Sequence, residues 1–243
     1  MQPVVRVVLF DLDDTLFAHR ESVEAGIRAH RAAIGGALAE ADAADEFARW
    51  HALEEHHYHR YLAGELDFRG QRRERARGFV APYGIELDDE AAQAWFEGFL
   101  AQYERTWALH ADVRDCLASL APRRFGIITN GELGFQTAKI RGLGLDALIP
   151  LENVVASGEV GAAKPDARIF RIAAERFGVA PGEACYVGDR LHTDAIGAAA
   201  AGLRGVWLDR RGTASPEQLA EAAAAGVPVI RALSELPALL AGR

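Results

Sequence analysis

Apolar and polar residues are patterned in two different ways along this chain. Between residues 20 and 107 the apolar residues recur at helical spacing, with charged residues between them. Four helices are expected there, over Glu21–Ile34, Asp45–Leu62, Phe68–Val80 and Asp88–Trp107. Four helices without an intervening strand predict a separate helical bundle.

The remainder of the chain alternates between short apolar runs and amphipathic segments. Strands are expected over Val4–Phe10, Phe125–Ile128, Val154–Val155, Ala184–Val187, Gly205–Leu208 and Val227–Ile230. Helices are expected between them over Val113–Leu120, Phe135–Gly142, Ala167–Phe177 and Ala195–Ala201, with a final helix at the end. This order predicts an α/β fold, a Rossmann-like parallel sheet flanked by helices with right-handed crossovers.

The first strand is separated from the other strands by the helical block. If that strand pairs with the others, the block is an insertion after the first strand, over the carboxyl edge of the sheet. We therefore expect a core of residues 1–16 and 109–243, with a helical-bundle cap over residues 17–108 that acts as a lid.

Composition and charge narrow the class of protein. The chain has 243 residues and a formal net charge of −8, which argues against a nucleic-acid partner but leaves room for a local phosphate pocket. No run approaches the ~20 apolar residues of a membrane span. The N-terminal apolar run ends in acids within a few residues, unlike a signal peptide. Cys116 and Cys185 are far apart in the sequence, so reduced core thiols are expected. We expect a cytoplasmic monomer or homodimer that does not bind membranes.

Acidic residues follow the first strand directly. Asp11 and Asp13 lie at i and i+2, so in an extended segment their side chains point the same way. They lie at the carboxyl end of a central strand, where open α/β sheets bind ligands. Two carboxylates held this close need compensation, which Mg²⁺ supplies most simply. The alternative is a strand followed by an Asp-rich turn.

Other polar groups follow the later strands. They are Thr129, Asn130 and Gly131, then Lys164, then Asp189 and Asp194. Taken singly, each has a structural explanation: a turn, a solvated loop, a strand exit or, for Asp194, a helix cap. The chain has only two lysines, Lys139 and Lys164, so each invites a functional question.

Together these groups suit phosphoryl transfer. One carboxylate can attack phosphorus, and a second can protonate the leaving oxygen and then activate water. The Thr129 hydroxyl, nearby backbone N–H groups and the Lys164 ammonium can hold phosphate oxygens and offset their charge. Asp189 completes an oxygen-rich site for Mg²⁺.

Four segments in this order resemble the motifs of the haloacid dehalogenase-like hydrolase superfamily: Asp11-Leu12-Asp13-Asp14-Thr15, Ile127-Ile128-Thr129-Asn130-Gly131, Lys164-Pro165 and Gly188–Asp194. The insert resembles that superfamily's C1 cap. The resemblance implies Asp11 as nucleophile, Asp13 as general acid/base, and Thr129 and Lys164 as catalytic stabilisers. It implies a phosphate-binding set of Leu12, Asp13, Thr129, Asn130, Gly131 and Lys164. It also implies Mg²⁺ on Asp11, the Asp13 carbonyl and Asp189, with Asp194 in support.

The expected function is a Mg²⁺-dependent phosphatase, a phosphoric monoester hydrolase that acts on a small nucleotide or sugar phosphate through an aspartyl-phosphate. Dehalogenases of the superfamily lack the second acid that Asp13 supplies, which argues against dehalogenation. No lysine lies between residues 16 and 138, which excludes Schiff-base chemistry in the cap. A phosphomutase stays an alternative, and a phospho-accepting signalling module is the alternative from another class.

The cap offers few clear candidates. His51, Glu55 and His59 share helical spacing and invite a metal hypothesis, against a solvated polar face. The arginine-rich helix, with Arg72, Arg73, Arg75 and Arg77, either reaches a second anionic group of a substrate or pairs with Glu74 in solvent. Phe17 and His19 follow the first motif and are candidates for the substrate cleft.

Overall fold

The computed structural model describes residues 3–241 and divides them into two compact units. The sheet unit comprises the described residues up to Ala18 and those from Ala108 onward, and the helical unit comprises His19–Trp107. None of the helices in the described part of the chain is long and apolar enough to span a membrane.

A six-stranded parallel sheet forms the centre of the sheet unit, in the order β3-β2-β1-β4-β5-β6. The strands are β1 (Val7–Phe10), β2 (Arg124–Thr129), β3 (Val154–Ala156), β4 (Ala184–Gly188), β5 (Arg204–Leu208) and β6 (Val229–Ile230). Strand β1 pairs with β2 on one side and β4 on the other, and all four of its residues are buried. The predicted α/β class and parallel sheet are therefore confirmed.

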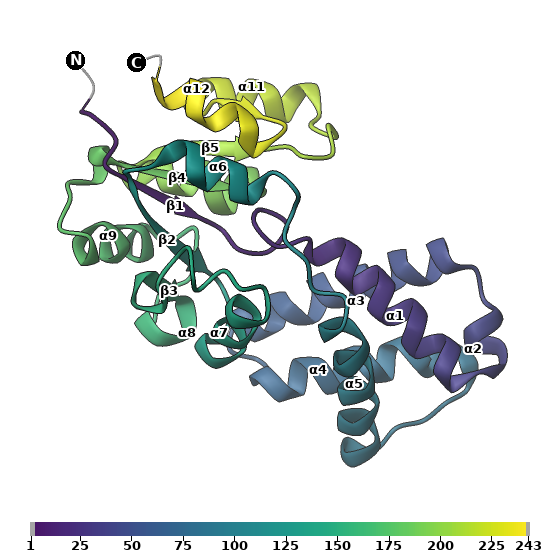
Figure 1. Ribbon diagram of the computed structural model, residues 1–243. Helices are drawn as coiled ribbons and strands as arrows, with labels where there is room; N and C mark the ends of the chain where they lie inside the picture. The colour runs from purple at the N-terminus through teal and green to yellow at the C-terminus, as the bar shows by residue number, and fades with distance from the viewer. Residues whose placement is uncertain (1–2, 242–243) are drawn as a thin grey trace. The chain divides into compact units, whose positions relative to one another are not determined.

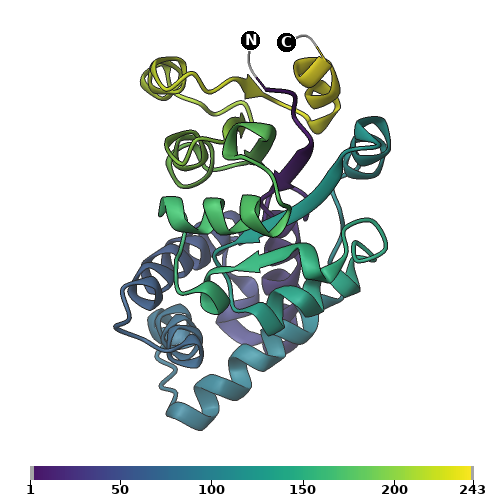
Figure 2. The ribbon, with the colours of Figure 1, turned by 90° about the vertical axis from the view of Figure 1, so that its left-hand side faces the viewer.

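Helices cover both faces of this sheet (Figures 1 and 2). They are α6 (Val113–Leu120), α7 (Leu133–Gly142), α8 (Ser157–Val160), α9 (Ala167–Arg176), α10 (Gly197–Ala200), α11 (Pro216–Ala224) and α12 (Leu236–Ala241). Figure 2 shows α6 and α12 on the opposite face from α9. On the α9 face, Ile169 and Phe170 pack with the inward side chains of the sheet, among them Leu9, Ile128 and Tyr186.

The helical unit contains α1 (His19–Ile34), α2 (Gly36–Glu40), α3 (Ala43–Leu62), α4 (Phe68–Val80) and α5 (Asp89–Glu104). Three of these helices begin after an aspartate whose carboxylate accepts from backbone N–H groups of the first turn: Asp42, Asp67 and Asp88. Trp50 is fully buried at the centre of the unit, with ring centroids 5.2 Å from Phe79 and 4.5 Å from Phe99.

Several element boundaries differ from the sequence expectation. Strand β1 begins at Val7, because pairing with β2 and β4 starts there, while Val4 is 77% exposed. Helix α2 was not expected. The buried Arg31 side chain stabilises the end of this helix by donating to the carbonyls of Leu38 (2.8 Å) and Ala41 (2.6 Å).

Two further helices differ at their ends. Helix α5 ends at Glu104, where Thr106 turns back and its hydroxyl donates to the Tyr103 carbonyl at 2.8 Å. The helix expected from Ala195 begins earlier, as a π turn over Leu191–Ile196, in which the Ala195 N–H donates to the Arg190 carbonyl. Such turns often occur at functional sites.

The chain leaves and re-enters the sheet unit through two adjacent segments. Phe17 and Leu109 form an antiparallel bridge, and the Ala18 N–H donates to the Ala108 carbonyl at 2.9 Å. Arg210, after β5, fastens both segments: its guanidinium donates to the Thr15 carbonyl and to both oxygens of Asp112.

Candidate active site

Asp11 and Asp13 lie in the loop that follows the central strand β1. The Asp11 N–H continues the pairing with β4 by donating to the Val187 carbonyl at 2.8 Å. Asp14 adopts a left-handed conformation, with φ of 59°, which aspartate tolerates better than most residues and which turns the chain back toward Phe17. The Asp11 side chain is 10% exposed and the Asp13 side chain 31%.

Lys164 joins the strand ends around β1. Its Nζ donates to Asp11 Oδ1 at 2.6 Å, to Asp194 Oδ1 at 2.7 Å and to the Tyr186 hydroxyl at 2.8 Å. The lysine side chain is only 3% exposed. A buried ammonium with three oxygen partners is a well-satisfied charge, so its position is fixed by the three groups that it links.

Burial dominates the electrostatics of the carboxylates. It raises the pKa of Asp11 to about 7, against the opposing charge of Lys164 and with the added repulsion of Asp194 and Asp13. Burial and the charges of Asp194 and Asp11 also raise the pKa of Asp189 well above its ordinary value. Burial alone would lower the pKa of Lys164, but the two carboxylates beside it outweigh that effect and raise it. The cluster is therefore rich in negative charge that a cation would stabilise.

Asp11, Asp189 and Asp194 form a candidate metal centre. Each offers a carboxylate oxygen, and these oxygens lie within 4.8 Å of one another. Asp194 is held by its other oxygen, which accepts from the Arg190 N–H at 2.9 Å, and the Trp207 indole donates to the Asp189 carbonyl. Hard oxygen donors with a shared excess of negative charge fit Mg²⁺. The Asp13 carbonyl stays a predicted ligand.

Helix α7 brings a second set of side chains to Asp13 and Thr129. Gln136 Nε2 donates to Thr129 Oγ1 at 2.6 Å and to Asp13 Oδ2 at 3.3 Å. Lys139 Nζ donates to Asp13 Oδ1 at 2.6 Å. Because the Thr129 oxygen accepts from Gln136, its own hydroxyl proton is left to donate elsewhere.

Asn130 is a structural link between two of the predicted motifs. Its side chain accepts from the Lys164 N–H at 2.6 Å and donates to the Lys164 carbonyl at 2.8 Å. Gly131 packs against Gln136, where an added Cβ would lie 2.6 Å from the amide nitrogen. The phosphate-binding roles of Leu12, Asn130 and Gly131 stay predictions.

The structure thus brings together all the predicted strand-end groups in two neighbouring sets, and it adds three residues to which the sequence reasoning assigned no role. Lys139 did carry a signal, since it is one of only two lysines in the chain. Gln136 and Tyr186 carry no comparable signal, because their types and spacing are ordinary for a helix and a strand. The cysteines behave as expected: both are free and buried, and burial raises the pKa of each thiol to about 12.

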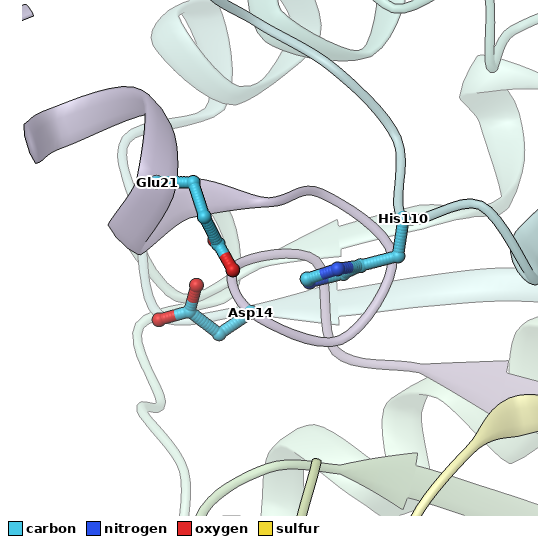
Figure 3. A group of neighbouring side chains, drawn as sticks. All are labelled: Asp14, Glu21 and His110. Atoms are coloured by element: carbon cyan, nitrogen blue, oxygen red, sulfur yellow. The ribbon is translucent and has the colours of Figure 1, made fainter. Parts of the chain in front are cut away.

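Asp14 and His110 lie close together near the junction with the helical unit (Figure 3). The Asp14 carboxylate and the His110 imidazole have ligand atoms within 4.8 Å of each other. The backbone N–H of His110 donates to the Leu16 carbonyl at 3.0 Å, which holds the returning chain against the loop after β1. The third labelled side chain, Glu21, belongs to the helical unit.

Inside the helical unit, two of the sequence alternatives are resolved by contacts. His59 is 69% exposed and lies 3.5 Å from Glu55, as on a solvated face. Arg75 departs from the expected solvent pairing: it is buried and pairs at 2.6 Å with Glu54 on α3. Glu54 also lies 3.8 Å from His19, whose Nδ1 is 2.9 Å from the Tyr103 hydroxyl. Phe17, which belongs to the sheet unit, was predicted to line the substrate cleft but is fully buried.

Comparison with known proteins identifies the family. The model of the haloacid dehalogenase-like hydrolases matches residues 5–202. The chain belongs to this family. It is 30% identical over 219 residues to a glyceraldehyde 3-phosphate phosphatase of Pyrococcus abyssi, covering 84% of this chain and 82% of that one.

Two further likenesses agree with this assignment. A phosphoserine phosphatase of Thermus thermophilus is 42% identical over 123 residues, which are 50% of this chain and 48% of that protein. The HAD-hydrolase YfnB of Bacillus subtilis shares the fold, with a TM-score of 0.77 at 21% identity over 98% of this chain and 99% of that one. This haloacid dehalogenase-like hydrolase therefore falls among the phosphoric monoester hydrolases, as the sequence predicted.

Proposed function

We propose that this hydrolase is a Mg²⁺-dependent phosphatase that cleaves small phosphorylated metabolites through an aspartyl-phosphate on Asp11. One observation carries the proposal: the Asp11 carboxylate is buried beside the ammonium of Lys164, and Asp13 stands two residues further along the same loop. This pairs a nucleophile with a proton carrier at the carboxyl end of the central strand, where α/β sheets bind their ligands.

In the first half-reaction, an Asp11 carboxylate oxygen attacks phosphorus and the bond from phosphorus to the ester oxygen breaks. Asp13, in its protonated form, gives its proton to the departing alkoxide. The Lys164 ammonium, held 2.6 Å from Asp11, offsets negative charge on the transferring group. The Thr129 hydroxyl, whose oxygen already accepts from Gln136, would donate its proton to a phosphate oxygen.

In the second half-reaction, water attacks the phosphorus of the aspartyl-phosphate. Asp13, now a carboxylate, takes the proton of that water as the new bond to phosphorus forms. The bond between Asp11 and phosphorus breaks, which releases inorganic phosphate and restores the Asp11 carboxylate. Asp13 ends the cycle protonated, ready for the next ester.

Asp11 and Asp189 would hold Mg²⁺, with Asp194 in support and the Asp13 carbonyl as a further ligand. A bound Mg²⁺ neutralises phosphate charge and lowers the repulsion between substrate and carboxylates. The close approach of the three carboxylates and the raised pKa values of Asp11 and Asp189 support this proposal.

For the substrate, we propose a small phosphate monoester, of the nucleotide or sugar phosphate class, selected by the helical unit acting as a cap. The names of the relatives support small esters, since one acts on glyceraldehyde 3-phosphate and another on phosphoserine. The uninterrupted helical insert between β1 and the rest of the sheet supports the role as cap.

The test is a screen of phosphorylated metabolites that measures released inorganic phosphate, with MgCl₂ or with EDTA. Nucleoside monophosphates, sugar phosphates, glyceraldehyde 3-phosphate and phosphoserine come first. The Asp11→Asn variant should lose at least about a thousandfold in kcat. Asp146→Asn, which removes an exposed carboxylate of the same unit, is the matched control and should retain full activity.

Retained turnover in Asp11→Asn would refute the aspartyl-phosphate. The same screen separates the alternatives, because a phosphomutase returns the phosphoryl group to an isomeric ester without releasing phosphate. A phospho-accepting signalling module would become phosphorylated once and would release no phosphate in repeated turnover.

A further inference from the structure

Lys139 is a buried cation to which the proposed mechanism gives no task. Its side chain is 2% exposed, and it lies in the last turn of α7. Its Nζ lies 5.0 Å from the ring centroid of Phe17 and 5.3 Å from that of Phe135. An ammonium between two aromatic rings has lost most of its hydration, so it needs a strong partner.

That partner is the carboxylate of Asp13. Lys139 Nζ lies 2.6 Å from Asp13 Oδ1, and Gln136 Nε2 lies 3.3 Å from Asp13 Oδ2. Gln136 and Lys139 are three residues apart on one face of α7, so both reach the same group. A carboxylate with a donor on each oxygen cannot rotate freely about its Cβ–Cγ bond.

We infer that Lys139 is a positioning residue that holds the Asp13 carboxyl at the angle needed for proton transfer to and from the substrate. The inference rests on the role proposed above for Asp13. It assigns a task to the second of the chain's two lysines: Lys164 acts at the nucleophile Asp11, and Lys139 acts through the proton carrier Asp13.

A positioning role makes a prediction that a purely structural role does not make. Proton donation matters for a poor leaving group, such as an alkoxide, and hardly matters for p-nitrophenolate, which leaves without a proton. Loss of Lys139 should therefore slow cleavage of alkyl phosphates selectively. A general loosening of the fold would slow both substrates together.

The experiment measures single-turnover release of the leaving group from p-nitrophenyl phosphate and from an alkyl phosphate, with saturating Mg²⁺. Lys139→Met keeps the length and volume of the side chain but removes the charge and the donor. We expect a 10- to 100-fold loss with the alkyl phosphate and less than about a threefold loss with p-nitrophenyl phosphate. Ile140→Val, at the neighbouring buried position of α7, is the packing control and should leave the ratio unchanged.

A double-mutant cycle with Asp13→Asn completes the test. If Lys139 acts through Asp13, the Asp13→Asn/Lys139→Met protein should be at most about threefold slower than the Asp13→Asn protein. Equal losses with both substrates, or losses that add in the double variant, would overturn the inference while leaving the phosphatase proposal intact. If instead Asp13→Asn does not discriminate between the leaving groups, the assigned role of Asp13 is wrong, and the role of Lys139 with it.

Discussion

At the scale of single residues, the site depends on where a side chain is missing as much as on where one is present. Gly188 ends β4 directly before Asp189, and a Cβ on it would lie 2.4 Å from Cγ of Asp194. The carboxyl group of Asp194 therefore occupies the space beside the glycine. This contact explains why a glycine precedes the acid at the strand end, which the sequence pattern alone does not.

Replacing Gly188 with alanine should displace Asp194 and, with it, one partner of Lys164. We expect a loss of about 1–3 kcal/mol in the free energy of unfolding, as for other overpacked positions, and at least a tenfold fall in kcat. Urea unfolding and phosphate release measure the two effects. Gly158→Ala is the control, since its Cβ would meet nothing closer than 3.6 Å, and it should be neutral. Wild-type activity in Gly188→Ala would show that Asp194 can move without consequence.

At the scale of elements, α3 and α4 are joined by an ion pair between the buried Arg75 and the partly buried Glu54. Arg75 Nη2 lies 2.6 Å from Glu54 Oε1, and the guanidinium lies 4.8 Å from the centroid of the Trp50 ring. Burial would raise the pKa of Glu54, but the charge of Arg75 and contacts with His19 and His51 outweigh it and hold that pKa well below its usual range. The pair therefore stabilises the helical unit fully at pH values above about 4.5. This contribution to stability is lost as the pH falls through the lowered pKa of Glu54.

Arg75→Ala should destabilise the helical unit by about 3 kcal/mol, because the partly buried Glu54 loses its main partner. Adding Glu54→Gln should recover part of that loss. Arg69→Ala, on an exposed position of the same helix, should change the free energy of unfolding by less than about 0.5 kcal/mol. Urea unfolding at pH 7 and pH 4 checks all three variants. An Arg75→Ala protein as stable as Arg69→Ala would mean that solvent already screens the pair.

Much of the sheet unit is predictable from the sequence, because its apolar strand segments are followed directly by acidic residues or glycine. Asp11, Asp13 and Asp189 are such cases. The contacts of α7 are not predictable in this way, since nothing in the spacing of Gln136 and Lys139 says which loop they reach. In the helical unit, amphipathic spacing cannot reveal that Arg75 is buried, because its partner lies on another helix.

At the scale of the whole molecule, the raised pKa values of Asp11 and Asp189 couple stability to pH and to divalent ions. A carboxyl whose pKa is raised by folding stabilises the fold while protonated, fully below its unfolded value of 3.8. That contribution is lost as the pH rises through the folded value, about 7 for Asp11. The metal-free protein is thus less stable to unfolding at neutral and alkaline pH, where a cation bound to the carboxylates would restore stability.

We therefore expect Mg²⁺ to raise Tm by several degrees at pH 8 and much less at pH 5, where protons compete for the same oxygens. Thermal unfolding in MgCl₂ and in EDTA at pH 5, 6.5 and 8 measures the difference. Asp189→Asn should raise Tm in EDTA at pH 8 and shrink the Mg²⁺ effect. A shift that is the same at all three pH values would place the bound ion somewhere other than on these carboxylates.

The paired segments at the junction have a consequence for how such proteins diversify. Phe17 and Ala18 lie against Leu109 and Ala108, so the two ends of the insert are already neighbours within the sheet unit. An insert of any length whose own ends lie close together can connect these two segments at little additional cost in loop-closure entropy. The register of β1 is set by its pairing with β2 and β4, all within the sheet unit, and not by the insert. The junction is therefore a boundary at which the insert could be exchanged for another while the sheet unit keeps its own pairing.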